Sequence, residues 1–261
     1  MLPRSRGILF SRIHPFVWLF GILLLSPINL LAEPTHSNVI CREEISRAHR
    51  EELAGKLRRI SGWSELGFDR SGALRRGNAP AVGGSSSARD LLEKAIYGRN
   101  VVVLEDASKR SDVAFYRLIP AKWKNNSLNS SPAYVVQIDF ADFEQVLGDA
   151  RALEAFNAGW GLLHEFDHII NDSPDAISPG ETGECEAHIN QMRRECNLPE
   201  RADYFYTPLP LSTQTTFSTK LVRLAFEQDQ PTENKKRRYW IVWDAKIVGG
   251  PEIHRQIAAS R

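Results

Sequence analysis

Two histidines four residues apart, with a glutamate directly after the first, stand in the segment LLHEFDHIIN, residues 162–171. On a helix, residues i and i+4 lie one turn apart on the same face, so His164 and His168 would hold one metal ion together. Glu165 is turned by about 100° from His164 on such a helix. It would lie beside the ion, where it could accept a proton from a metal-bound water. The spacing therefore predicts a zinc-dependent hydrolytic site.

The competing interpretation is an exposed helical turn whose charged side chains share no role. The flanking residues argue against it, because leucines precede the histidines and isoleucines follow them. We expect one helical segment from about Asp149 to Ile170, with a buried stripe of Leu153, Phe156, Trp160, Leu163 and Ile170. Gly159 and Gly161 each cost a helix about 1 kcal/mol. We therefore expect close packing to require them.

A third metal ligand is available in the segment GETGECEAHINQMRRE that follows. Three protein ligands leave the fourth position of zinc open, as a catalytic site requires. Glu184 and Glu186 are the candidates, and on a regular helix they point about 200° apart. Glu186 shares a face with Ile189 and Asn190, which suits packing against the histidine helix, so we predict Glu186. Glu184 stays open as the alternative, because the helix need not have begun near Gly183.

HEFDH followed by ECEAHIN resembles the gluzincin zinc peptidases, in which a glutamate on a following helix completes the zinc site. In thermolysin-like members that glutamate is followed by alanine, and Glu186-Ala187 matches. The resemblance implies a zincin-like fold, Zn2+ as the cofactor and peptide-bond hydrolysis. It also implies a carboxylate one turn later that orients a histidine. Here Asn190 takes that position, and we expect its neutral amide to hold the imidazole.

The segment INQMRRECNLPERADY is similar to RxExGLPxRxxY of some bacterial effector-type HExxH peptidases. The matching residues are Arg193, Glu195, Leu198, Pro199, Arg201 and Tyr204. Asn197 replaces the glycine, and Ile189 stands where those proteins carry a glutamate, so their ligands do not transfer. Residues 62–206 also resemble uncharacterised exported bacterial proteins with HELDH-type motifs.

The residues around the proposed site have plainer interpretations too. We interpret the charged residues among the matches as a salt-bridged brace. Tyr204 is a candidate donor to a developing oxyanion, as is Tyr206, with a packed tyrosine as the competing interpretation. Asp172 and Asp175 are interpreted as helix-end and turn residues, with calcium ligation as the alternative.

The first 32 residues predict a secretory signal. MLPRSRGILFSRIH carries three arginines and no acidic residue, and the apolar run PFVWLFGILLLSPINLLA follows it up to Ala32. This order is typical of signal peptides. The uninterrupted apolar part from Phe16 to Leu25 is short for a membrane span, which needs about 20 residues. We predict export, periplasmic or secreted, with a membrane anchor as the alternative if the segment stays uncleaved.

Charge and cysteine content restrict the functional classes further. The chain has 33 basic and 32 acidic residues. Without residues 1–32, which hold three arginines, the net charge is −2, so no nucleic-acid partner is predicted. The run KKRR at 235–238 is interpreted as a turn before YWIVW. Cys185 and Cys196 lie about 16 Å apart if both are on one helix, too far for a disulfide. Pairing of Cys41 with either stays open.

The remaining patterns predict an α+β fold. A helix within 42–62 would end at Gly62, and a second would begin with Ser87 as its N-cap. Strands are expected at Asn100–Asp106, Val113–Ile119 and Ala133–Phe140, and a hairpin from TKLVRLAFEQ and RRYWIVWDAKIV. Residues 33–261 would form a single zincin-like domain, with a small sheet, a zinc-binding helix pair and a C-terminal β-hairpin. We expect a peptide substrate to lie along AYVVQIDF as the sheet edge.

The sequence thus predicts an exported zinc metallopeptidase that acts on a peptide or protein. His164, His168 and Glu186 would bind Zn2+, Glu165 would be the general base, and Tyr204 would assist catalysis. The alternative is a catalytically inactive metal-binding envelope or interaction protein of the same fold, which would hold metal without turnover.

Overall fold

The computed structural model describes residues 36–108, 110–122, 132–209, 220–230 and 235–248, all within one compact unit, Pro34–Arg261. The fold is mixed α+β, as predicted. The helices of these residues are α1 (Arg47–Ser61), α2 (Ser86–Tyr97), α3 (Phe140–Glu144), α4 (Ala150–Ala155), α5 (Ala158–Asn171) and α6 (Gly183–Glu195). None of them is long and apolar enough to cross a membrane. The predicted signal at residues 1–32 lies outside the described residues.

The first sheet has the strand order β1-β4-β6-β5. Its strands are β1 (Val39–Cys41), β4 (Val101–Asp106), β6 (Pro132–Ile138) and β5 (Tyr116–Lys122). The first three are parallel and β5 is antiparallel to β6. The prediction that Ala133–Phe140 forms the sheet edge is therefore wrong, because β6 lies between β4 and β5. Val136 and Ile138 are fully buried, as is typical of an inner strand. The edge strands of this sheet are β1 and β5.

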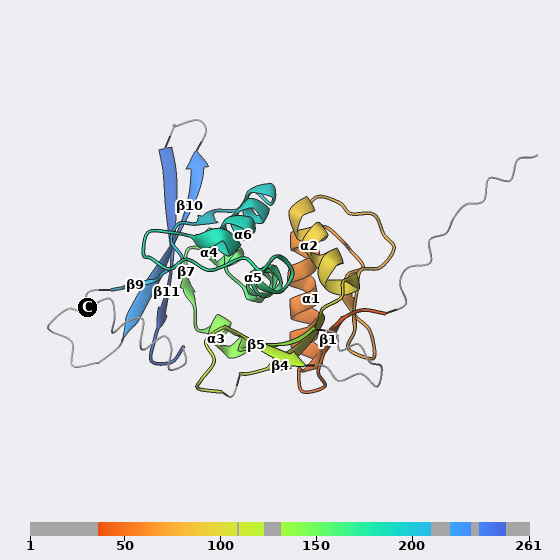
Figure 1. The fold of residues 1–261 in the computed structure, drawn as a ribbon. Coiled ribbons are helices and arrows are strands. Elements are labelled where there is room, and N and C mark those ends of the chain that lie inside the picture. Colours follow the sequence, from red (N-terminus) through yellow and green to blue (C-terminus); the bar gives the residue numbers. More distant parts are fainter. Residues whose placement is uncertain (1–35, 109, 123–131, 210–219, 231–234, 249–261) are drawn as a thin grey trace, which may run out of the picture. The chain divides into compact units, whose positions relative to one another are not determined.

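A second sheet is built around the predicted C-terminal hairpin, which is confirmed (Figure 1). Strands β10 (Leu221–Gln230) and β11 (Lys235–Asp244) pair along their full length, flanked by β7 (Leu147–Gly148), β8 (Glu200–Arg201) and β9 (Thr207–Pro208). A small pair, β2 (Gly67–Phe68) and β3 (Leu74–Arg75), stands apart. The run KKRR is not a turn but the start of β11. Arg238 pairs there with Glu227 across the ladder, because opposite charges favour this position.

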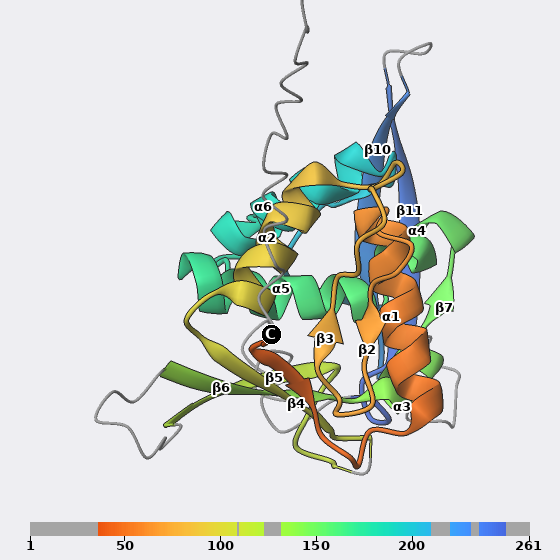
Figure 2. The same ribbon diagram turned by 90° about the vertical axis from the view of Figure 1, so that its right-hand side faces the viewer.

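Helix α5 packs against α1, α2 and α6 and against strands β5 and β6 (Figures 1 and 2). The predicted single helix from Asp149 to Ile170 is interrupted at Phe156 and Asn157. Asn157 is extended and its side chain accepts a hydrogen bond from the Gly159 amide, so it begins α5 as an N-cap. Trp160 and Leu163 are buried as predicted, whereas Leu153, Phe156 and Ile170 are only partly buried.

The glycines of α5 have the predicted packing reason. A Cβ on Gly161 would lie 2.3 Å from the Tyr116 ring, and one on Gly159 would lie 2.7 Å from Lys56 Cβ. Gly62 ends α1 in the left-handed conformation, as predicted. The predicted N-cap Ser87 is wrong by two residues, because Ser85 caps α2.

Candidate metal and catalytic site

Three atoms from α5 and the segment after it converge on one point. The Nε2 atoms of His164 and His168 are 3.1 Å apart. Asp175 Oδ1 lies 3.1 Å from the first and 3.3 Å from the second. The predicted histidine pair is thus brought together, and Asp175, which we expected to be a turn residue, joins it. These residues and Cys185 form a group that could hold a metal ion.

The separations of these atoms fit a small tetrahedral cation. Ligand atoms at about 2.0–2.1 Å from zinc in a tetrahedron lie roughly 3.3 Å from one another. In the described part of the chain, Asp175 Oδ1 is buried and has no hydrogen-bond partner of acceptable direction, although both imidazole nitrogens are near. A buried carboxylate oxygen without a hydrogen bond destabilises the folded state unless a cation lies next to it. Two imidazole nitrogens and a carboxylate oxygen are a donor set that suits zinc.

The segment after α5 places Asp175 at the histidines. Asp172 ends α5 in the left-handed conformation, with φ at 56°, which confirms it as a helix-end residue. Ser173 O then lies 2.6 Å from Nδ1 of His168, so it can accept a hydrogen bond that leaves Nε2 free for a metal. Asp175 pairs with Gly183 in an isolated β-bridge, which joins the two ends of the segment between Asp175 and the start of α6.

Tyr204 is the second constraint on Asp175. Its hydroxyl donates a hydrogen bond of 2.8 Å to Oδ2, the oxygen that faces away from the histidines. Its ring lies near the His164 ring, with centroids 6.1 Å apart. The predicted site residue Tyr204 is therefore at the metal group, where it orients the carboxylate.

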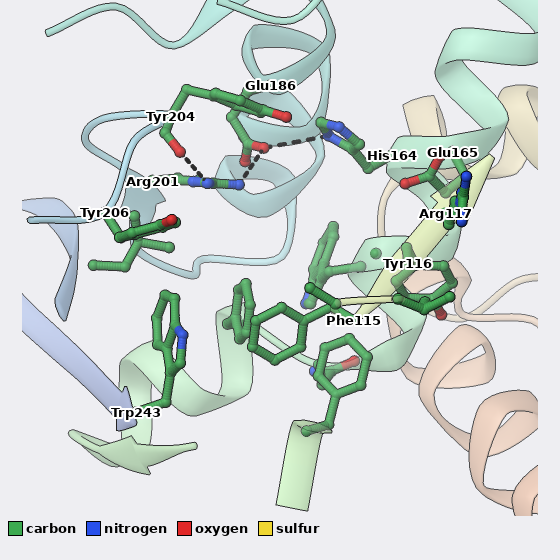
Figure 3. Close-up of a pocket in the computed structure, with 18 of the residues that line it drawn as sticks. Phe115, Tyr116, Arg117, His164, Glu165, Glu186, Arg201, Tyr204, Tyr206 and Trp243 are labelled. Carbon is green, nitrogen blue, oxygen red and sulfur yellow. Dashed lines mark hydrogen bonds and ion pairs between the residues drawn. The ribbon is translucent and has the colours of Figure 1, made fainter. Parts of the chain in front are cut away.

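Glu186 is inside the protein, whereas Glu184 is exposed. The buried guanidinium of Arg193 donates to one carboxylate oxygen of Glu186. Arg201 Nη1 lies 3.1 Å from the other oxygen (Figure 3). Burial alone would raise the pKa of Glu186, but the charges of Arg193 and Arg201 hold this pKa well below its usual range. Glu186 is thus ionised and enclosed.

The carboxylate of Glu186 faces the side of His164 that points away from Asp175. Its Oε2 lies 3.3 Å from His164 Nδ1, whereas Nε2 of the same ring faces His168 and Asp175 (Figure 3). A carboxylate in this position fixes the orientation of a metal-binding imidazole. Direct ligation by Glu186 stays a prediction.

Asn190 does not hold an imidazole, so that prediction is wrong. Its Oδ1 accepts hydrogen bonds of 2.8 Å from Arg193 Nη1 and from the Arg201 amide, and its Nδ2 donates to Arg201 O. The reason is that Arg193 occupies the same helix face one turn on. Asn190 therefore supports the arginines that enclose Glu186, which partly confirms the predicted brace.

Cys185 is the second residue that the sequence analysis missed at this site. It is fully buried, and its Sγ lies 3.3 Å from His164 Nδ1. The cysteines of the described residues, Cys41, Cys185 and Cys196, are all free thiols. A cysteine directly before the predicted ligand Glu186 was a usable signal, because thiolates are common zinc ligands.

Glu165 is buried on α5 beside the metal group and lines a cavity of about 280 Å³. Among the described residues, no hydrogen bond ends on its carboxylate. Burial raises its pKa. The polar end of the cavity carries His164, Glu165, Glu186, Arg201 and Tyr204, with Tyr116 and Arg117 beside Glu165 (Figure 3). The aromatic end carries Phe115, Tyr206 and Trp243 (Figure 3), together with Phe143 and Phe156, which pack on Phe115.

The site thus combines three converging atoms that could hold a metal ion, an adjacent carboxylate without a hydrogen-bond partner among the described residues, and a cavity of about 280 Å³. Such a combination can activate water and transfer its proton. No protein-family model, no curated protein and no solved structure matches this chain.

Proposed function

We propose that the protein is a zinc-dependent peptidase. The observation that supports it best is the position of Glu165, a buried carboxylate that lines the cavity together with His164 and lies close enough to His164, His168 and Asp175 to interact with their charges. A general base has to stand within reach of the proton that it removes, and its pKa should approach the working pH. The burial that raises the pKa of Glu165 acts in that direction.

Zinc would be held by His164 Nε2, His168 Nε2 and Asp175 Oδ1. When bound there, zinc would polarise the scissile carbonyl and lower the pKa of water at its open position. Ser173 would fix the imidazole ring of His168, and Glu186 would fix that of His164. Each contact is made at Nδ1, the ring nitrogen on the side away from the zinc. Tyr204 would hold the carboxylate of Asp175. The alternative within this proposal follows from the gluzincin resemblance and makes Glu186 the third ligand.

Glu165 would accept the proton of the attacking water and deliver it to the leaving amine. Its carboxylate is free for this role, because no hydrogen bond from the described residues occupies it. Part of the surrounding cavity is lined by aromatic rings, and apolar surroundings of this kind strengthen electrostatic interactions within the site. A tyrosine hydroxyl would steady the oxyanion; Tyr206 lines the cavity and is the candidate, because the Tyr204 hydroxyl already donates to Asp175.

The test combines metal analysis with a peptide-library cleavage assay on purified protein. We expect one zinc per chain and cleavage that a chelator abolishes. Glu165→Gln should keep the zinc and lose turnover by a factor of at least about 100. Glu184→Gln, the same change at an exposed position on α6, is the matched control and should cut like the wild type. Full activity of Glu165→Gln would contradict the assigned role.

The second candidate is a metal-binding protein without catalysis, and Cys185 is the observation that favours it. His164, His168, Asp175 and Cys185 offer ligand atoms that all lie within 4.8 Å of one another. Four protein ligands would close the coordination sphere, as in structural zinc sites. Cobalt-substituted protein decides this point. A thiolate-to-cobalt absorption that disappears in Cys185→Ser would support the closed site, and its absence would support the peptidase.

A further inference from the structure

We propose that the aromatic end of the cavity binds an aromatic side chain of the substrate, next to the bond that is cut. The position of that bond rests on the proposed function. The binding itself does not, because the rings form a pocket whether or not the metal group hydrolyses anything. Trp243 of β11 and Phe115 would then be specificity-determining residues.

The rings come from segments that are far apart in the sequence. Phe115 packs edge-on against Phe156 and Trp243, with centroids 5.2 and 5.5 Å away. Phe156 and Trp243 are nearly parallel, at an angle of 7° and with centroids 6.2 Å apart. Tyr206 closes this end at 5.6 Å from Trp243. Such edge-on and parallel arrangements are the ones that a further aromatic ring joins favourably.

Phe115 is held in an unfavourable backbone conformation at the centre of this cluster. Its φ is 57°, a region that bulky residues rarely adopt. Two hydrogen bonds of 2.9 Å fix it, one from its amide to Asp142 Oδ2 and one from the Asp139 amide to its carbonyl. Strain of this kind persists where the surrounding structure imposes it, and it is concentrated at ligand sites. The backbone hydrogen bonds of Phe115, and not only its side-chain packing, therefore fix the position of its ring.

The indole nitrogen of Trp243 is a buried donor for which the described residues provide no acceptor. Its side chain is 3% exposed, and its Nε1 is buried without a hydrogen-bond partner among the described residues. A buried donor left unpaired is unfavourable by about 1–3 kcal/mol. A peptide carbonyl could accept this hydrogen bond once the Trp243 ring turns its edge toward the cavity that it lines.

The aromatic end is also continuous with the catalytic end. Gly161 lies between Trp160 and His164 on α5 and lines the same cavity as Glu165. Its missing side chain leaves room for the Tyr116 ring, which a Cβ would approach to 2.3 Å. A substrate residue among the rings would thus have its backbone near Glu165. Asp112 and Arg117 also line the cavity, but they pair with each other. A charged side chain of the substrate among the rings would therefore lack a partner, which is costly.

Binding of capped pentapeptides tests the proposal apart from turnover. The probes are acetyl-Ala-Ala-X-Ala-Ala-amide peptides with X as phenylalanine, alanine or glutamate. They are titrated calorimetrically into the full-length, zinc-loaded Glu165→Gln protein. We expect the phenylalanine peptide to bind at least about tenfold more tightly than the other two, the scale of discrimination by an apolar pocket. Equal binding of the three peptides would overturn the proposal.

Three variants test which residues cause the preference for the phenylalanine peptide. Trp243→Phe should lower the phenylalanine-over-alanine ratio at least threefold. Trp240→Phe, the same change on the outer face of β11, should leave it unchanged, because Trp240 lies between Arg223 and Arg238 outside the cavity. Ala114→Phe should abolish the ratio, since Ala114 lines the cavity and is only partly buried. A ratio that survives Ala114→Phe in a protein with wild-type melting temperature would refute the pocket.

Cleavage of the same peptides by the wild type separates the two proposals. Selective binding without cleavage of any peptide would keep the aromatic pocket and defeat the peptidase. Cleavage of all three peptides at equal rates would keep the peptidase and defeat the pocket.

Discussion

Replacing Glu186 by glutamine should destabilise the protein strongly even when no metal is bound. The carboxylate is 1% exposed and faces two guanidinium groups, of which Arg193 is 3% and Arg201 15% exposed. Removing one member of a buried ion pair costs about 3–5 kcal/mol, because the remaining charge stays buried without its partner. We expect a loss in this range for Glu186→Gln. Glu184→Gln should change stability by less than about 0.5 kcal/mol.

Urea unfolding of the zinc-free variants measures this effect, and competition with a chromophoric chelator measures zinc affinity. If Glu186 only orients His164, its loss should weaken zinc binding by about 10–100-fold. A zinc-free stability within about 1 kcal/mol of the wild type would refute the ion-pair argument. Combined with a loss of zinc binding far beyond 100-fold, that outcome would make Glu186 the third ligand.

The same variant predicts a pH dependence. The two neighbouring guanidinium groups hold the pKa of Glu186 well below its ordinary value of 4.5 in the folded protein. Its ionised form therefore stabilises the fold fully above about pH 4.5, and this stabilisation disappears as the pH falls through the lower, folded-state pKa. The stability gap between the wild type and Glu186→Gln should be constant above pH 4.5 and should narrow below it. A gap that widens on acidification would contradict the assignment.

Three further outcomes are expected. Asp175→Asn should lose zinc when measured by elemental analysis, whereas Asp172→Asn, at the end of α5, should retain one ion per chain; retention of zinc by both would exclude Asp175 as a ligand. Trp160→Ala should cost about 3–5 kcal/mol in urea unfolding, because the side chain is buried at 2% exposure; a loss below about 1 kcal/mol would mean that the helix packs through another face. Gly161→Ala should cost about 1–3 kcal/mol, since the new Cβ meets the Tyr116 ring at 2.3 Å; an unchanged melting temperature would show that the ring yields freely.

The parts of the site that follow helical periodicity could be predicted from the sequence. His164 and His168 meet because the spacing of four is one turn, whatever the surroundings are. Glu186 faces inward and Glu184 outward, as predicted, because both follow the start of α6 at Gly183 and are two residues apart on it. These inferences needed only the geometry of one helix and the pattern of its apolar residues.

Asp175 could not be predicted in this way, because it follows the end of a helix. Its position depends on the left-handed Asp172 and on the bridge to Gly183, neither of which produces a repeating pattern. The one local signal is Ser173-Pro174, since proline cannot continue the helix and the acid comes directly after it. The order of β5 and β6 was missed for a related reason. Strand order is set by contacts between distant segments, which a local apolar pattern does not encode.

The converging atoms of His164, His168 and Asp175 lie within a short stretch of chain, and this has a consequence for the order of assembly. Closing so short a segment around an ion costs little chain entropy, and its residues are synthesised early relative to the C-terminal hairpin. The aromatic end of the cavity, by contrast, requires Trp243 of β11, which meets Phe115 and Phe156 only after a long further stretch of chain has been made. If the proposed metal site and pocket are correct, a nascent or partly folded molecule would be able to capture the ion before the aromatic end of the cavity has formed.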